Sequence, residues 1–341
     1  MRPSRLLGLL AAASLALALA ACSAPAPNGG DASSDGTFPL KIRNAYGTTT
    51  IEKKPVRVAT VAWMNHEVPL ALGIVPVGMS RATWGDDDGD GVLPWVEDRL
   101  KELHAKTPVL FDETDGIDFE AVADTRPDVI LAAYSGLSKE EYEKLSKIAP
   151  VVSFPKVAWG TSVDDMIRIE STALGEERKG DELVASLDTT TKDALATHPA
   201  LASAKVLFAF ADPTDLSKLG FYTAHDTRPG FLASLGMPEP SIVTEESKKT
   251  DQFFVEISSE QAQRFDDVDL IVTYGDPTGD TVARLQADPL LSKIPAVARG
   301  SVAVLEDSTP LAASANPSPL SIGWGVDRYF SALAAALKPG T

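Results

Sequence analysis

Short aliphatic runs alternate with helical patterns along most of the chain, and this alternation restricts the possible folds more than any other feature. Such runs lie at 56–61, 75–79, 128–133 and 151–154, and again at 206–210, 269–274 and 301–305. Runs of this length, separated by helices, are typical of parallel α/β units. A period-two pattern over 40–43 and 48–51 predicts an opening β-hairpin ahead of them.

One long helix is predicted between the two parts. Residues 176 to about 197 carry Leu183, Leu187 and Leu195 on one side, and Pro199 follows just past the end. At 1.5 Å per residue, roughly 22 residues make about 33 Å, which is the width of a small domain. A helix of this length can act as a stiff strut between two lobes.

The motifs of the first part are repeated, weakly, in the second. Residues 231–236 resemble residues 70–73, residues 268–272 resemble residues 126–131, and residues 295–297 resemble residues 148–152. Such a weak repeat can arise by chance between unrelated α/β domains. Because one stiff helix stands between the two parts, the repeat favours two lobes with a cleft between them. Clefts between domains are a preferred place for ligands. We therefore predict an α/β fold of two similar lobes with mostly parallel central sheets: a first lobe at 38–175, a connecting helix at 176–198 and a second lobe at 199–341.

The N-terminal segment has the pattern of an export signal. Two arginines precede an apolar run that ends at Ala21, and its strongly apolar positions are fewer than the roughly 20 that a membrane span needs. Residues 19–22 (Leu-Ala-Ala-Cys) resemble the lipobox of bacterial lipoproteins. We expect a signal peptide at 1–21, a lipid on Cys22 and a flexible tether at 22–37. The alternative is an ordinary signal peptide with a chance cysteine.

Cysteine count and charge are consistent with an exported protein that a lipid anchors. Cys22 is the only cysteine in the chain, so intramolecular disulfides are excluded. The formal net charge is −17, and so acidic a surface repels nucleic acid and anionic lipid headgroups. We expect a monomer held at the outer face of the cell membrane by its lipid, with no nucleic-acid partner.

Signatures of catalysis and of bare metal binding are missing from the sequence. It contains no G-x-S-x-G elbow, no G-x-x-x-x-G-K-[ST] phosphate loop and no G-x-G-x-x-G fingerprint. The four histidines, His66, His104, His198 and His225, are scattered and form no i, i+4 pair, which argues against a transition-metal site. We expect that the protein is not an enzyme. The alternatives are a surface hydrolase or oxidoreductase, or a structural lipoprotein without a ligand.

Several short stretches, in this order and spacing, resemble one family. They lie at 46–49, 54–58, 70–78, 127–132, 145–150, 231–236, 258–260 and 317–321. Together they are similar to the iron-siderophore (ferrichrome, ferrioxamine and cobalamin type) solute-binding proteins of ABC importers. The resemblance implies the class III periplasmic-binding-protein arrangement, with two α/β lobes, one connecting helix and only slight closure around the ligand. It does not name the ligand.

The resemblance also implies a partner, the permease subunits of an ABC importer. Members of the family dock through one acidic residue at the tip of each lobe. The matching residue is Glu140 in the first lobe, with Glu141 as a possible substitute, and Glu260 in the second. All stand at predicted helix starts, where the helix dipole favours an acid, so capping alone is the alternative.

Aromatic residues stand at the ends of several predicted strands. Ligands of open α/β sheets lie beyond the carboxyl ends of the strands, so these residues can face one cleft. Flat rings suit a bulky iron chelate, and arginine donates charge-assisted hydrogen bonds to its oxygens. The candidate ligand-binding residues are Trp63, Arg81, Trp84, Tyr134, Trp159, Tyr222, Arg228 and Tyr274; core packing is the alternative for each ring. Because basic residues are few, a neutral or cationic ferric hydroxamate siderophore is favoured, with haem or cobalamin as alternatives.

An acidic loop matches the calcium-binding pattern D-x-D-x-D-G-x₅-E. Its ligands would come from Asp86, Asp88 and Asp90, from the backbone of Val92 and from Glu97. The entering helix of an EF-hand is missing, since the preceding run is predicted to be a strand. The sequence leaves two interpretations, a Ca²⁺ site or a solvated acidic loop.

Overall fold

The first half of the chain builds an entirely parallel sheet of five strands in the order β5-β4-β3-β6-β7. Its strands are β3 (Val58–Thr60), β4 (Gly78–Ser80), β5 (Val109–Phe111), β6 (Val129–Ala132) and β7 (Val151–Ser153). The predicted opening hairpin is present as β1 (Leu40–Asn44) and β2 (Gly47–Ile51), which pair antiparallel. The helices of this lobe are α1 (Glu67–Ala71), α2 (Pro94–Glu102), α3 (Phe119–Asp124), α4 (Lys139–Leu145) and α5 (Val163–Ala173).

The second half builds a mixed sheet of five strands in the order β10-β9-β8-β11-β12. Strands β8 (Val206–Phe210), β11 (Leu270–Gly275) and β12 (Val302–Glu306) are parallel. At one edge, β9 (Lys218–Tyr222) pairs antiparallel with both β8 and β10 (Phe254–Ser258). The helical segments are α7 (Pro199–Ala202), α8 (Thr227–Ser234), α9 (Ser241–Ser247), η1 (Ser259–Phe265), α10 (Thr281–Ala287), η2 (Leu291–Lys293), α11 (Pro295–Ala298), α12 (Pro310–Ser314) and α13 (Ser321–Ala336).

These sheets confirm the predicted fold class of two α/β lobes with mostly parallel central sheets. Strand β6 shows why the sequence folds this way: its Val-Ile-Leu-Ala run is buried at every position, as expected for a central parallel strand covered on both faces. Strand β1 instead alternates exposed and buried residues, as a strand with one solvated face does. The antiparallel pair β9–β10 was not predicted.

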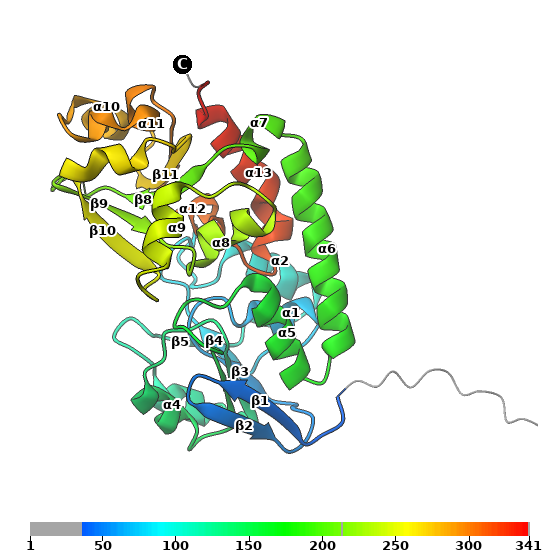
Figure 1. The fold of residues 1–341 in the computed structure, drawn as a ribbon. Coiled ribbons are helices and arrows are strands. Elements are labelled where there is room, and N and C mark those ends of the chain that lie inside the picture. Colours follow the sequence, from blue (N-terminus) through cyan, green and yellow to red (C-terminus); the bar gives the residue numbers. More distant parts are fainter. Residues whose placement is uncertain (1–35, 213, 340–341) are drawn as a thin grey trace, which may run out of the picture. The chain divides into compact units, whose positions relative to one another are not determined.

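Helix α6 (Glu177–Ala196) is the long helix between the two halves. It packs against α5 of the first lobe and α13 of the second, as Figure 1 shows. Its contact with α5 requires a glycine, because a Cβ at Gly180 would lie 2.0 Å from the Ser171 hydroxyl oxygen. Its 20 residues correspond to about 30 Å. The helix therefore spans both lobes as a strut.

The computed structural model describes residues 36–212 and 214–339. Cys22, the predicted signal peptide and most of the predicted tether lie outside the described residues. Within the part that is described, no helix combines the length and apolar character that crossing a membrane would need.

Candidate ligand-binding site

Both lobes contribute to a cavity of about 270 Å³. The first lobe supplies Trp63, Trp84, Tyr134 and Trp159, and the second supplies Tyr222, Asp226, Arg228, Phe253 and Asn316. The first-lobe residues come from loops that follow β3, β4, β6 and β7. They meet because the carboxyl ends of parallel strands lie at one edge of a sheet.

The first-lobe wall consists of interlocked rings. Trp63 and Trp84 have ring centroids 6.5 Å apart, and Tyr134 and Trp159 form an edge-to-face pair at 5.3 Å. The backbone of Trp159 is left-handed, with φ of +60°, a strained conformation for a bulky residue. Gly136 accommodates it, since a Cβ there would lie 2.2 Å from the Trp159 indole nitrogen. This wall offers flat apolar faces in fixed positions.

The second-lobe wall carries a buried ion pair. The Nη1 atom of Arg228 donates to both carboxylate oxygens of Asp226 at 2.9 and 3.0 Å, and its Nε donates to the Tyr274 hydroxyl at 3.0 Å. Its guanidinium also lies 4.3 Å from the centroid of the Tyr222 ring. The two charged side chains are only 14% and 2% exposed. Since the charges cancel, this wall is polar but close to neutral.

Electrostatics within this wall keep the ion pair charged. Burial alone would lower the pKa of Arg228, but the neighbouring Tyr274 and Asp226 raise it. Burial raises the pKa of Asp226, and Arg228 opposes that shift. The pair therefore depends on both partners, because either charge alone would be buried without compensation.

Three hydrogen bonds across the cavity join the lobes, and a fourth links two residues of the second lobe. The Trp84 indole donates to Asp307 at 3.1 Å, and the Tyr134 hydroxyl lies 3.2 Å from the Thr227 hydroxyl. The Asn316 amide donates to the Tyr134 hydroxyl at 3.3 Å and accepts from Thr227. These contacts close the floor of the cavity with polar groups from both lobes.

Six of the eight predicted ligand-binding residues line this cavity: Trp63, Trp84, Tyr134, Trp159, Tyr222 and Arg228. Tyr274 is one layer behind, bonded to Arg228 and packed edge-to-face on Trp84 at 5.3 Å. The structure does not place Arg81 in the cavity. Its side chain lies over Gly91 and borders a separate small cavity.

Three further cavity residues were not identified from the sequence. Asp226 caps helix α8 by accepting from the Arg228 amide, so a helix-start pattern was its only signal. Phe253 precedes the unpredicted strand β10. Asn316 directly precedes the 317–321 motif and carried no signal of its own.

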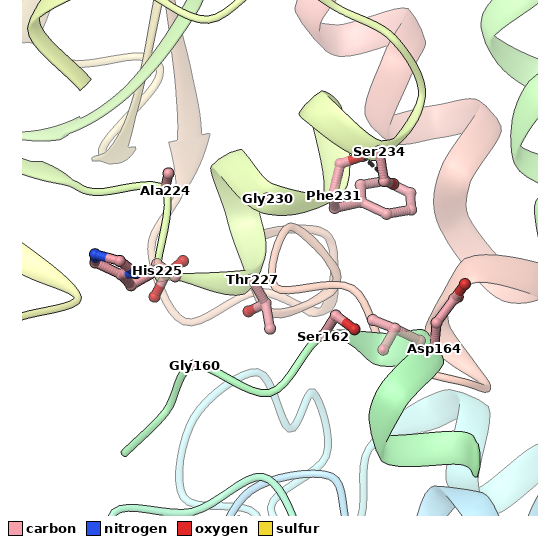
Figure 2. Close-up of a pocket in the computed structure, with 11 residues that line it drawn as sticks. Gly160, Ser162, Asp164, Ala224, His225, Thr227, Gly230, Phe231 and Ser234 are labelled. Carbon is pink, nitrogen blue, oxygen red and sulfur yellow. Dashed lines mark hydrogen bonds between the residues drawn. The ribbon is translucent and has the colours of Figure 1, made fainter. Parts of the chain in front are cut away.

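A second cavity, of about 160 Å³, adjoins the first (Figure 2). It lies between the segment at 160–164 and helix α8, and it shares Asp226 with the aromatic cavity. Figure 2 shows Ser162 and Asp164 facing Phe231 and Ser234, while the His225 ring points away. It offers a single aromatic ring, so the larger cavity is the candidate site.

The acidic loop brings three of its predicted ligands together. Asp86, Asp88 and Asp90 each offer an oxygen within 4.8 Å of the others, and Gly91 turns with φ of +88°. Glu97 is not part of this group; it pairs with Lys101 at 3.0 Å. Strand β4 and not a helix precedes the loop.

The predicted docking residues lie at helix starts in both lobes. Glu140 is an exposed residue in the first turn of α4. Glu141 forms a capping box, accepting from the Ser138 amide at 2.7 Å. Glu260 is the second residue of η1, and its amide donates to the side chain of the cap residue Ser258. In the first lobe, capping is thus carried by Glu141, which leaves Glu140 the better candidate for docking.

Two α/β lobes joined by a long helix, with an aromatic cavity between them, define an extracytoplasmic solute-binding protein. The chain belongs to the periplasmic binding protein family, whose sequence profile matches residues 58–309. Members of this family are solute-binding proteins. This finding confirms the resemblance inferred from the short motifs.

Individual relatives are similar over most of the chain. The crystal structure of Streptococcus pneumoniae TIGR4 PiaA in complex with ferrichrome is 46% identical, with a TM-score of 0.84, covering 89% of this chain and all of that one. The probable siderophore-binding lipoprotein YfiY of Bacillus subtilis is 29% identical over 75% of this chain and 74% of its own. The Fe(3+) dicitrate-binding periplasmic protein FecB of Escherichia coli is 25% identical over 80% and 84%.

Proposed function

We propose that this protein captures a neutral ferric hydroxamate siderophore in the aromatic cavity and delivers it to an ABC import permease. The buried, self-neutralised ion pair of Arg228 and Asp226 is the observation that carries the proposal. Three singly charged hydroxamates neutralise a ferric ion, so such a chelate adds no net charge to the cavity. A ferric catecholate or citrate complex is anionic and would need uncompensated cations there.

Each wall has a role in this proposal. The rings of Trp63, Trp84 and Trp159 contact the outer surface of the chelate, where apolar burial favours binding. Nε and Nη1 of Arg228 are engaged within the protein, and the remaining nitrogen, Nη2, donates to the chelating oxygens. The similarity to PiaA, solved with ferrichrome, supports a hydroxamate. The more distant similarity to FecB is the argument for ferric citrate instead.

A fluorescence titration tests the ligand class. Three of the five tryptophans line the cavity, and ferric chelates absorb light, so ferrichrome should quench much of the tryptophan emission in a saturable way. Ferric citrate, a ferric catecholate, haem and cobalamin are the comparison ligands. Tight, saturable quenching by an anionic chelate but not by ferrichrome would reject the hydroxamate assignment.

We propose that Cys22 is the mature N-terminus and carries the lipid that anchors the protein. The similarity to a siderophore-binding lipoprotein supports this. Cys22→Ala should release the protein from membranes or leave it unprocessed, which cell fractionation and intact mass measure. A variant that is processed and sediments with membranes as the wild type does would contradict the anchor.

We propose that Glu140 and Glu260 dock the two lobes on the two permease subunits. Reversing both charges, Glu140→Arg with Glu260→Arg, should spare ligand affinity and abolish uptake in cells lacking the wild-type protein, because docking charges act on the partner. Glu141→Ala is the matched control: it removes the capping-box acceptor and should cost about 0.5–2 kcal/mol of folding stability while uptake persists. Normal uptake by the double variant would refute this docking assignment.

We also propose that the loop at 86–90 binds Ca²⁺ weakly, through Asp86, Asp88 and Asp90. Carboxylate oxygens that converge within 4.8 Å support this. The loop begins two residues after Trp84 of the cavity, so an ordered loop would also steady that ring.

A further inference from the structure

A fully buried carboxylate in the first lobe clamps the second lobe. Glu67, the first residue of α1, has no exposed surface. It accepts from the Trp95 indole of its own lobe at 2.8 Å, and from two groups of the second lobe: the Ser318 hydroxyl at 2.5 Å and the Leu320 amide at 2.9 Å. Every neighbour is a donor, so the site fits an acceptor-only group.

Two residues earlier, Asn65 cross-braces the first lobe. Its side chain accepts from the Tyr134 amide and donates to the Tyr134 carbonyl, both at 2.8 Å. The same amide group donates to the carbonyls of Val61 at 2.8 Å and Trp63 at 3.1 Å. Asn65 thus links the loop after β3, which carries Trp63, to Tyr134, which follows the end of β6. Both rings line the cavity.

That loop needs such support. Trp63 stands between Ala62 and Met64, which both have left-handed backbones with φ of +62° and +55°. Non-glycine residues adopt this conformation only when their surroundings hold them there. The position of the Trp63 ring therefore depends on Asn65.

The clamp on the second lobe also leads to the cavity. Asn316 lies two residues before Ser318, lines the cavity, and bonds to Tyr134 and Thr227. The turn held by Glu67 thus carries the polar floor, while Asn65 holds the aromatic wall. Burial raises the pKa of Glu67 to about 7, although its hydrogen-bond donors oppose the shift. The charged form of this side chain is therefore unfavourable where it is buried, and the hydrogen bonds of the clamp offset part of that cost.

We infer that Asn65 and Glu67 form a positioning brace that sets the aromatic cavity before any ligand arrives. The inference rests on the proposed function, since it concerns the same cavity. Preorganised sites bind more tightly because less ordering remains to be done on binding. A brace residue therefore changes ligand affinity without touching the ligand.

Ser318→Ala tests the brace with little risk to folding, because it removes one hydroxyl. Ser301→Ala is the matched control: Ser301 is also a buried serine of the second lobe, and it donates to the Asp269 carbonyl at 2.6 Å. With ferrichrome as the probe, Ser318→Ala should bind on the order of tenfold more weakly, because it loses the hydroxyl's bond to Glu67 and the bond that the hydroxyl accepts from the Ser321 amide. Ser301→Ala should bind like the wild type while its melting temperature falls comparably.

Two further measurements keep the inference testable. Glu67→Gln turns an amide donor toward the donors around it, so it should weaken ferrichrome binding more than Ser318→Ala does. Without ligand, the NMR signals of the Trp63, Trp84 and Trp159 indole N–H groups should shift in Ser318→Ala and stay in place in Ser301→Ala. This second readout decides the inference even if the wild type binds no ferric chelate, in which case the proposed function alone fails. Unchanged indole signals, or unchanged ferrichrome affinity in both brace variants of a binding-competent protein, would overturn the brace.

Discussion

The two lobes contribute residues to the same cavity from different kinds of structural element. In the first lobe, Trp63, Trp84, Tyr134 and Trp159 all follow parallel strands. In the second lobe, Tyr222 ends an antiparallel strand, Phe253 precedes another, and Arg228 stands in the first turn of a helix. Two similar sheets thus provide an apolar wall on one side and a polar wall on the other.

One buried acid in each lobe shows a related difference. Asp226 of the second lobe is matched by Arg228 at 2.9 Å. Glu67 of the first lobe is matched only by neutral donors. The second lobe therefore mainly determines which ligand charge the cavity accepts, and the first lobe mainly determines the shape of the cavity. The predictions below test that division.

The largest effect is expected from Arg228→Met. It leaves Asp226 charged and 2% exposed, so the free energy of unfolding should fall by about 3–5 kcal/mol. Adding Asp226→Asn removes the orphaned charge and should recover most of that loss, as urea unfolding would measure. Ferrichrome affinity should stay low in both variants. A double variant that binds as the wild type does would show that the ion pair is only structural.

A pH series on Glu67→Gln tests the first-lobe acid. The folded pKa of Glu67 is raised to about 7 by burial, above its unfolded value of about 4.5. The folded state therefore binds the Glu67 proton more tightly than the unfolded state does. The stability that this difference contributes is complete below about pH 4.5 and is lost as the pH rises to about 7. Over that window the wild type should lose about 3 kcal/mol relative to Glu67→Gln. Parallel unfolding curves for the two proteins would exclude a raised pKa at Glu67.

Trp63→Ala tests the apolar wall. Loss of one good aromatic contact should weaken ferrichrome binding by about 1–3 kcal/mol. Phe119→Ala is the matched control, since Phe119 is a partly buried ring of the same lobe that starts α3, away from the cavity. Isothermal titration of both variants compares them. Equal affinity for Trp63→Ala and the wild type would move the contact surface elsewhere.

The sequence predicted the first lobe's wall better than the second's, for a physical reason. Parallel strands are continuous aliphatic runs, so their ends, and Trp63 or Tyr134 beyond them, can be located by inspection. Strand β9 contains Lys218 and Gly220, which interrupt its apolar run, so it was missed together with its neighbour, the edge strand β10. Strand β4 begins later than its predicted run because Pro76 cannot donate a ladder hydrogen bond.

Side-chain partners across the lobes could not be predicted at all. Glu67 and Ser318 are 251 positions apart, and the 317–321 motif that contains Ser318 gave no indication of its partner. Arg81 was grouped with the cavity residues because it closely follows a strand, as Trp84 does; in the structure its side chain lies over Gly91 and does not line the cavity. Strand ends locate residues, but the loop that follows decides where each side chain points.

The smallest effect is expected at the acidic loop that follows Trp84, for which the loop that follows Tyr274 in the second lobe serves as the comparison. In the first lobe, Asp86, Asp88 and Asp90 converge. In the second, Asp276 stands two residues after Tyr274 and, within the described residues, belongs to no such group; one of its oxygens accepts from the amide and hydroxyl of Thr278 at 2.8 and 2.7 Å. Only the first-lobe loop should therefore bind Ca²⁺, with a dissociation constant of about 10⁻⁴–10⁻³ M, as in extracellular modules.

At tenfold that concentration, Ca²⁺ should stabilise the wild type by about 1.4 kcal/mol and raise its melting temperature by a few degrees. Asp88→Ala should abolish both the calorimetric heat and the melting shift, because it removes one of three converging carboxylates. Asp276→Ala, the matched control, should retain both. Because Glu97 is held by Lys101 at 3.0 Å, Lys101→Ala should free the acid at the twelfth loop position and tighten Ca²⁺ binding. A wild type without heat or melting shift at millimolar Ca²⁺ would leave a solvated acidic loop, and the lobes would then differ in their cavity walls alone.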